Sequence, residues 1–264
     1  MQISSSLRQF SNSPIMSLMS HKLQAVHSSI HATAITASRR PDSVALLAVS
    51  KTFGADAVLE AVAAGQRAFG ENYLQEALTK MAEVELKLAL KSGEGDDVLL
   101  EWHFIGPIQS NKTRAIAEHF DWVHTVDREK IAQRLSQQRP PQLAPLNICL
   151  QVNISGEASK SGLAPAEVKD VARAIAGLPG LKLRGLMAIP EPTDDLEKQH
   201  AAFRRTRQLL EQLQQDPDMQ QAGQQLDTLS MGMSADMAAA IEEGATIVRV
   251  GSAIFGQRER NHDK

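Results

Sequence analysis

The sequence predicts a single α/β domain with the (β/α)8 TIM-barrel fold, and three observations support this prediction. Eight apolar segments of strand length alternate with helical patterns along the chain, which favours a parallel closed sheet over a sandwich. The length of 264 residues is close to the ~250 residues of a typical barrel. The last two apolar segments lead into turns of small residues, where such barrels often bind phosphate. A doubly wound open sheet is the alternative, because a count of strands does not establish closure.

The expected strands are apolar runs bounded by polar residues or glycine, as strands of a parallel sheet are. They cover residues 45–50, 67–70, 102–105, 122–126, 148–153, 181–189, 226–230 and 247–251. Apolar residues at helical spacing predict helices between most of them. These helices cover residues 55–64, 74–88, 110–119, 127–138, 165–176, 196–214 and 235–242, whereas residues 91–97 and 216–225 are expected to be polar insertions.

The N-terminal region permits two interpretations. Residues 1–41 contain no Asp or Glu and are rich in serine, a composition that resembles a transit peptide. However, Leu23, Val26 and Ile30 recur at helical spacing, so we expect a helix over residues 21–38 that belongs to the fold. The predicted organisation is a flexible extension over residues 1–19, a barrel domain over 20–258 and a tail over 259–264.

Composition restricts the function. The formal net charge is −3 and the basic residues are scattered, so we expect no nucleic-acid partner. The single cysteine, Cys149, excludes an internal disulfide and fits a reducing, cytoplasmic compartment. It lies in an apolar run, which favours a core thiol over a nucleophile. No apolar segment approaches the ~20 residues that cross a bilayer, so we expect no membrane partner.

The two C-terminal turns predict an anion site. Backbone N–H groups of Gly232, Met233, Ser234, Gly251 and Ser252 are expected to point at one phosphate, with Ser234 opening the next helix. Nearby, Arg249 is a lone cation in an apolar strand, where a charge needs a partner. It shares strand parity with Gly251, which places it one layer deeper in the barrel.

Further candidates follow the first three strands. Lys51 ends the first strand, where an amine with a depressed pKa can form an imine; a solvated strand-end lysine is the alternative. Asn72 follows the second strand and is a candidate ligand contact, or an ordinary turn residue. His103 is interpreted as a hydrogen-bonded core residue rather than an acid or base. No ligand spacing predicts a metal. A phosphate site, an imine-forming lysine and an internal cation together fit pyridoxal 5′-phosphate (PLP).

Seven motifs give the sequence a family resemblance. They are A-V-S-K-T (48–52), F-G-E-N-Y-L-Q-E (69–76), E-W-H-F-I-G-P-I-Q-S-N-K (101–112), H-T-V-D (124–127), G-L-M-A-I-P (185–190), L-S-M-G-M-S-A-D (229–236) and V-R-V-G-S-A-I-F-G (248–256). The chain resembles the YggS/PROSC family of PLP homeostasis proteins over about residues 20–258. This resemblance implies a barrel similar to the N-terminal domain of alanine racemase.

The resemblance also implies roles for the candidate residues. Lys51 would be the Schiff-base lysine, Asn72 would contact the cofactor, and Arg249 would face the pyridine nitrogen. The phosphate would be held by Ser234, Gly251 and Ser252.

The main functional hypothesis is a monomeric PLP carrier or buffer without catalytic residues, which delivers PLP to apo PLP-dependent enzymes. The alternative is a PLP-dependent amino-acid racemase or related enzyme. Arg249 only donates hydrogen bonds, so it favours an unprotonated pyridine and weakens the ring as an electron sink. Two-base racemisation in alanine racemase uses a tyrosine from a C-terminal β-domain; this sequence ends soon after Gly256, and its one tyrosine, Tyr73, lies in the second-strand motif. We therefore expect no racemisation.

Overall fold

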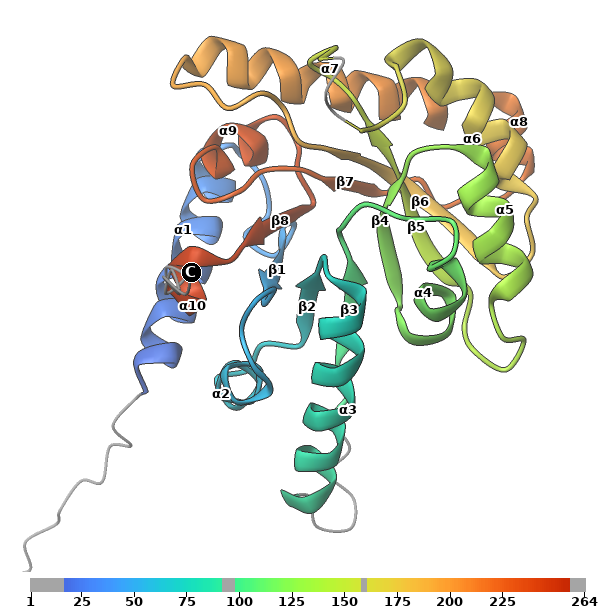
Figure 1. Cartoon of the computed structure of the whole chain (residues 1–264). Coiled ribbons are helices and arrows are strands. Elements are labelled where there is room, and N and C mark those ends of the chain that lie inside the picture. Colours follow the sequence, from blue (N-terminus) through green and yellow to red (C-terminus); the bar gives the residue numbers. More distant parts are fainter. Residues whose placement is uncertain (1–16, 92–97, 158–160, 257–264) are drawn as a thin grey trace, which may run out of the picture.

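Eight parallel strands form a closed barrel in the order β1 to β8, and helices surround it (Figure 1). The computed structural model describes residues 17–91, 98–157 and 161–256. The strands are β1 (Ala45–Val49), β2 (Ala68–Glu71), β3 (Glu101–Phe104), β4 (Trp122–Val126), β5 (Leu146–Val152), β6 (Leu181–Ala188), β7 (Thr228–Ser230) and β8 (Ile247–Val250). All eight coincide with predicted strands to within a few residues, and the closed order confirms the barrel over the open sheet.

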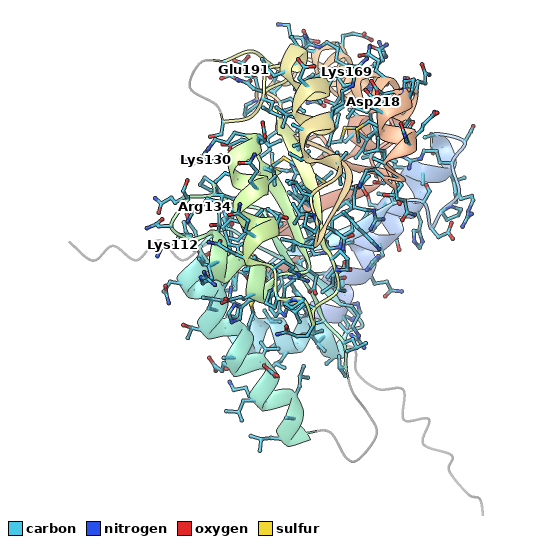
Figure 2. The ribbon with its side chains drawn as sticks, turned by 90° about the vertical axis from the view of Figure 1, so that its right-hand side faces the viewer. Lys112, Lys130, Arg134, Lys169, Glu191 and Asp218 are labelled. Atoms are coloured by element: carbon cyan, nitrogen blue, oxygen red, sulfur yellow. The ribbon has the colours of Figure 1, made fainter. Side chains whose placement is uncertain are left out.

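At least one helix follows each strand, two helical segments follow β5 and β6, and α1 precedes β1. The helical segments are α1 (Leu18–Thr36), α2 (Ala55–Ala63), α3 (Leu74–Lys91), α4 (Thr113–His119), α5 (Glu129–Gln138), η1 (Pro165–Glu167), α6 (Val168–Ala176), α7 (Leu196–Gln214), α8 (Pro217–Gln221), α9 (Met237–Glu242) and α10 (Ser252–Phe255). Charged side chains lie on their outer faces, as Lys130 on α5, Lys169 on α6 and Asp218 on α8 show in Figure 2. No described helix combines the length and the apolar character that crossing a bilayer requires.

Two short helices, α8 and α10, were not predicted. The segment expected to be a polar insertion contains α8, which begins at Pro217 after the carboxylate of Asp216 accepts a hydrogen bond from the Asp218 N–H. Single helical turns are too short to produce a periodic apolar pattern. The same holds for α10, which has four residues.

The N-terminal helix belongs to the fold, as predicted. It begins at Leu18, and the Ser17 hydroxyl accepts a hydrogen bond from the Ser20 N–H at its start. Met19, Leu23 and Ile30 are buried against the rest of the chain. Most of the predicted extension and the whole C-terminal tail lie outside the described residues, so those two assignments stay predictions.

The main apolar core lies between the strands and the helices, whereas the inside of the barrel is largely polar. Apolar residues such as Phe69, Ile116 and Leu150 form the outer core. Inside the barrel, the apolar cluster of buried residues consists of Trp122, Cys149 and Met187. Burial raises the pKa of the Cys149 thiol to about 12, so the thiol stays protonated at neutral pH, and its interpretation as a core residue is confirmed.

The wall between β6 and β7 depends on a glycine. Gly185 has a φ of +156°, and a Cβ at this position would lie 1.9 Å from the carbonyl oxygen of Thr228 on β7. A side chain at residue 185 would therefore push two paired strands apart.

We predict that Gly185→Ala lowers the free energy of unfolding by about 3 kcal/mol or more, because backbone strain and overpacking add. Denaturant titration measures this change. The matched control is Gly177→Ala at the end of α6, where a Cβ has open space and the expected change is under about 1 kcal/mol. Equal effects of the two substitutions would contradict the prediction.

Candidate functional site

A cavity of about 780 Å³ opens at the carboxyl ends of the strands, the end at which barrel enzymes bind their ligands. We call it the rim pocket. It is lined by Val49, Lys51, Thr52, Phe53, Asn72, Ile105, Ile189, Met233, Ser234, Ala235, Arg249, Gly251, Ser252 and Gly256. All six residues that the sequence singled out as cofactor contacts are among them.

Lys51 reaches the rim pocket from the end of β1. Leu47 pairs with Arg249 across the β1–β8 ladder, and strand alternation carries Val49 and Lys51 on the same interior face. Lys51 is half-buried. Lys51 is one of the residues that form the pocket wall.

A buried ionic cluster supports the turn that carries Lys51. The Lys80 ammonium on α3 donates to the Ser50 carbonyl at 2.8 Å and to Glu71 Oε1 at 2.6 Å. The Ser50 hydroxyl donates to the same Glu71 oxygen at 2.6 Å. Burial raises the pKa of Glu71, and the contacts with Lys80 and Ser50 oppose that change. This cluster joins the ends of β1 and β2 beneath the turn.

Thr52, next to Lys51, has a left-handed backbone. Its φ is +68°, a value that is rare for a β-branched residue. The Thr52 N–H donates to Glu76 Oε1 at 2.6 Å, and the same carboxylate oxygen accepts from Lys80 at 3.0 Å. The strained turn is thus fixed by the ionic cluster, which the sequence analysis did not identify.

Asn72 presents an amide to the rim pocket from the loop after β2. Its Oδ1 atom is buried and has no hydrogen-bond partner among the described residues, which is costly unless a ligand donates to it. Gly106 packs directly against this residue, since a Cβ there would lie 2.2 Å from the Asn72 carbonyl oxygen. The close contact fixes the backbone that carries the amide.

The loop after β7 differs in part from the predicted anion cradle. The Met233 N–H donates to Asp236 Oδ1 at 2.6 Å, so this donor is already used and the prediction that it faces the anion is wrong. Ser234 does not open the next helix either, because α9 begins at Met237 after Asp236. Ser234 is exposed and lines the pocket. Its hydroxyl is one group that this loop can offer a ligand.

The loop after β8 supplies the opposite wall. Gly251 precedes α10, and Ser252 is the first residue of that helix. A Cβ at residue 251 would approach the Val49 carbonyl oxygen to 3.1 Å, so the absence of a side chain lets the backbone lie close to β1. The first N–H groups of a helix have no intrahelical acceptor, and here they lie beside the Ser252 hydroxyl.

Arg249 lies at the floor of the rim pocket. Its guanidinium is almost fully buried and donates to the Ser230 carbonyl at 2.7 Å, to the Ser230 hydroxyl at 2.9 Å and to the Ala188 carbonyl at 3.1 Å. Desolvation lowers the pKa of Arg249 to about 10, so it remains charged at neutral pH. These three acceptors are uncharged, and the Glu71 carboxylate contacts Ser50 and Lys80 rather than Arg249.

His103 is a buried, hydrogen-bonded residue, as predicted, but it is not isolated. Its Nδ1 lies 2.8 Å from Nε2 of His124, and its Nε2 lies 2.7 Å from Glu101 Oε1. His124 was missed because its neighbours come from strands far away in sequence. Within the described ranges, no group of three or more His, Cys, Asp or Glu side chains is arranged to hold a metal.

Comparison with known proteins identifies the family. The family described as alanine racemase, N-terminal domain, matches residues 22–259. The pyridoxal phosphate homeostasis protein of Pseudomonas aeruginosa is 59% identical over 244 residues, which cover 92% of this chain and 97% of the relative. The chain belongs to the pyridoxal phosphate homeostasis protein family. The predicted family resemblance is thereby confirmed.

Two solved structures resemble the fold. PipY of Synechococcus elongatus, determined with PLP bound, has a TM-score of 0.73 and 36% identity, with 90% of this chain and 100% of that chain covered. Alanine racemase of Corynebacterium glutamicum has a TM-score of 0.58 and 18% identity, with 92% of this chain and 63% of that chain covered. The second likeness concerns the barrel fold alone.

The buried His124 makes the stability of this protein sensitive to acid. Burial, followed by the charges of His103 and Arg249, lowers the pKa of His124 well below 6.5. The unfolded chain therefore binds a proton below pH ~6.5 that the folded chain does not bind, and stability falls as the pH falls.

We predict that His124→Gln reduces the pH dependence of the unfolding free energy by about 1.4 kcal/mol per pH unit below pH ~6.5. Urea titrations at several pH values between neutral and mildly acidic measure this slope. His119→Gln, which removes an exposed ring, should leave the slope as in the wild type. A wild-type slope in the His124 variant would refute the assignment.

Proposed function

We propose that this protein binds PLP in the rim pocket and acts in intracellular PLP homeostasis as a carrier or buffer. The observation that carries this proposal is the convergence of three chemical groups on one cavity. An amine at Lys51 suits an aldehyde, hydroxyl and N–H donors at Ser234, Gly251 and Ser252 suit a phosphate, and the buried cation Arg249 lines the same cavity. The relative PipY, whose structure holds PLP, supports the same ligand.

Several features of the pocket fit this cofactor. The volume of about 780 Å³ lies in the range of small-molecule sites. The buried, unpartnered Oδ1 of Asn72 would accept a hydrogen bond from a ligand hydroxyl. The glycine at residue 251 lets the loop after β8 lie close to Val49 of β1, so that both loops border the cavity. When bound, PLP would supply an electrophilic aldehyde and a ring that withdraws electrons.

The charge of the pocket floor favours a holding role over catalysis. Arg249 is a donor that remains protonated, so it would stabilise an unprotonated pyridine nitrogen, the state in which the ring withdraws electrons least. The sole tyrosine, Tyr73, is not among the residues that line the cavity. We propose accordingly a monomeric, cytoplasmic, non-enzymatic protein whose partners are PLP and the apo-enzymes that receive it.

We predict that Lys51→Ala abolishes the covalent PLP adduct that borohydride traps in the wild-type protein. The fold should persist because a half-buried lysine at a strand end contributes little packing. Mass spectrometry of reduced, digested protein locates the adduct. Lys112→Ala, which removes an exposed lysine, is the control and should retain the adduct. A full adduct in the Lys51 variant would mean that another lysine carries the cofactor.

We predict that the double variant Ser234→Ala, Ser252→Ala binds PLP at least ~10-fold more weakly, because one hydrogen bond to a charged group contributes about 1.5–3 kcal/mol. Its affinity for pyridoxal, which lacks the phosphate, should change little. Equilibrium titration with both ligands measures the difference. Equal losses for PLP and pyridoxal would place the phosphate elsewhere, and Ser28→Ala on the exposed face of α1 controls for preparation effects.

A further inference from the structure

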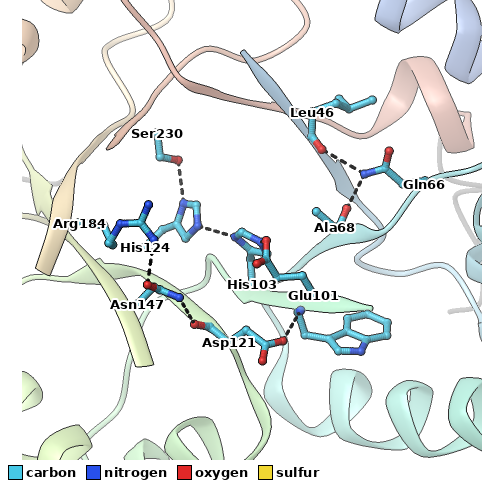
Figure 3. A network of polar contacts seen from close by, with 11 residues as sticks. Leu46, Gln66, Ala68, Glu101, His103, Asp121, His124, Asn147, Arg184 and Ser230 are labelled. Atoms are coloured by element: carbon cyan, nitrogen blue, oxygen red, sulfur yellow. Dashed lines mark hydrogen bonds and ion pairs between the residues drawn. The ribbon is translucent and has the colours of Figure 1, made fainter. Parts of the chain in front are cut away.

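A continuous network of hydrogen bonds runs through the barrel interior from Arg249 to Glu101, and Figure 3 shows the part that contains Ser230, His124, His103 and Glu101. It begins at Arg249, which donates to the Ser230 hydroxyl at 2.9 Å. The Ser230 hydroxyl lies 2.7 Å from Nδ1 of His124, and Nε2 of His124 lies 2.8 Å from Nδ1 of His103. Nε2 of His103 then meets Glu101 at 2.7 Å.

The chain connects a buried cation to the opposite end of the barrel. Ser230, His124 and His103 are buried. Glu101 is the first residue of β3, and half of its side chain is exposed. Since the rim pocket lies at the carboxyl ends of the strands, Glu101 lies at the opposite, N-terminal end. The hydrogen-bonded network thus links the floor of the rim pocket with solvent at the N-terminal end of the barrel.

Donor and acceptor chemistry gives the chain one direction. Arg249 can only donate, so the Ser230 oxygen accepts from it, and the Ser230 hydrogen is left for Nδ1 of His124. A neutral His124 then carries its proton on Nε2 and donates to His103, which in turn donates through Nε2 to the carboxylate. Every bond points from the cation toward the anion.

Neighbouring groups hold the two imidazoles in place. The His103 ring stacks on Trp122 with centroids 5.4 Å apart, and the Arg184 guanidinium lies over the Trp122 ring, 4.7 Å from its centroid. Arg184 is fixed by Asp227 at 2.8 Å and by the Asn147 side-chain oxygen at 3.0 Å. Ionisable groups from six strands or their ends surround this hydrogen-bonded network. They are Glu101 on β3, Asp121 before β4, Cys149 on β5, Arg184 on β6, Asp227 before β7, Asp236 after β7 and Arg249 on β8. The first two strands contribute the uncharged residues Leu47 and Gly70.

We propose that Ser230, His124 and His103 are positioning residues that hold Arg249 toward the rim pocket and couple its charge to the distant carboxylate of Glu101. Arg249 has no carboxylate in contact among the described ion pairs. The hydrogen-bonded network, which ends at the Glu101 carboxylate, compensates the positive charge of Arg249 across the barrel. The state of Glu101 and His103 thereby sets how positive the pocket floor is.

Uptake of one proton by the chain would reverse two of its bonds. A His103 with both ring nitrogens protonated donates to His124 as well as to Glu101. His124 must then accept at Nε2 and carry its own proton on Nδ1, which donates to the Ser230 oxygen. The Ser230 hydroxyl loses its acceptor, and a second positive charge faces Arg249. Acid at the far end of the barrel would thus loosen the group at the pocket floor.

The first experiment uses ligand-free protein, so it does not depend on the proposed function. Nitrogen-15 spectra of histidine-labelled protein at mildly alkaline pH report which ring nitrogen carries the proton. We expect both His103 and His124 to carry it on Nε2. A proton on Nδ1 of His124 in the wild-type protein would overturn the chain direction.

The second experiment rests on the proposed function and uses the protein loaded with PLP. In Glu101→Gln the acceptor remains but the charge is lost, so the pocket becomes more positive, and the pH midpoint of the visible absorption of bound PLP should shift downward. Asp121→Asn removes a nearby charge at the same end of the barrel that is outside the chain; its midpoint should stay at the wild-type value. Equal shifts in both variants, or none in Glu101→Gln, would overturn the coupling, whereas failure of the wild type to bind PLP would reject the proposed function alone.

Discussion

The burial of one guanidinium is the constraint on which the interior of this barrel depends. A charge in an apolar barrel is unfavourable unless polar groups surround it. Arg249 obtains two carbonyl oxygens and one hydroxyl from β6 and β7. That hydroxyl needs its own acceptor, which is His124, and this requirement continues to His103 and Glu101. The interior therefore contains a polar network beside the apolar cluster of Trp122, Cys149 and Met187, where barrels usually contain layers of branched aliphatic residues.

Closure of the barrel by the β1–β8 ladder is what assembles the rim pocket. The ladder pairs Leu47 with Arg249 and Ala48 with Val250. It thus places the turn after β1 next to the turn after β8, so that Lys51 and Gly251 line the same cavity. On the other side of β1, the ionic cluster of Lys80, Glu71 and Glu76 fixes the Lys51–Thr52 turn from below. The turn that carries Lys51 and the loop that carries Gly251 are consequently held by separate sets of contacts.

Local patterns were sufficient to predict the strands and the pocket residues, but not the contacts between them. Apolar runs marked all eight strands, and strand parity placed Arg249 below Gly251. The link between His124 and Ser230 joins residues 106 positions apart, and it depends on a closed barrel with a defined stagger. Similarly, Asp236 captures the Met233 N–H through a turn geometry that no periodic pattern reveals. Residues whose position follows from a single strand could be predicted from the sequence. Contacts that depend on the register between strands could not.

The division of the rim pocket between the first and last strands has a consequence for biosynthesis. Its walls extend from Val49 to Gly256, so the site is incomplete until the segment after β8 has been synthesised. Domains generally fold as units during synthesis. A ligand that contacts both walls stabilises the closed barrel only. It does not stabilise a chain that lacks one of the walls. A ligand that contacts both walls would therefore bind chains that contain both β1 and β8, and not fragments that lack the segment after β8.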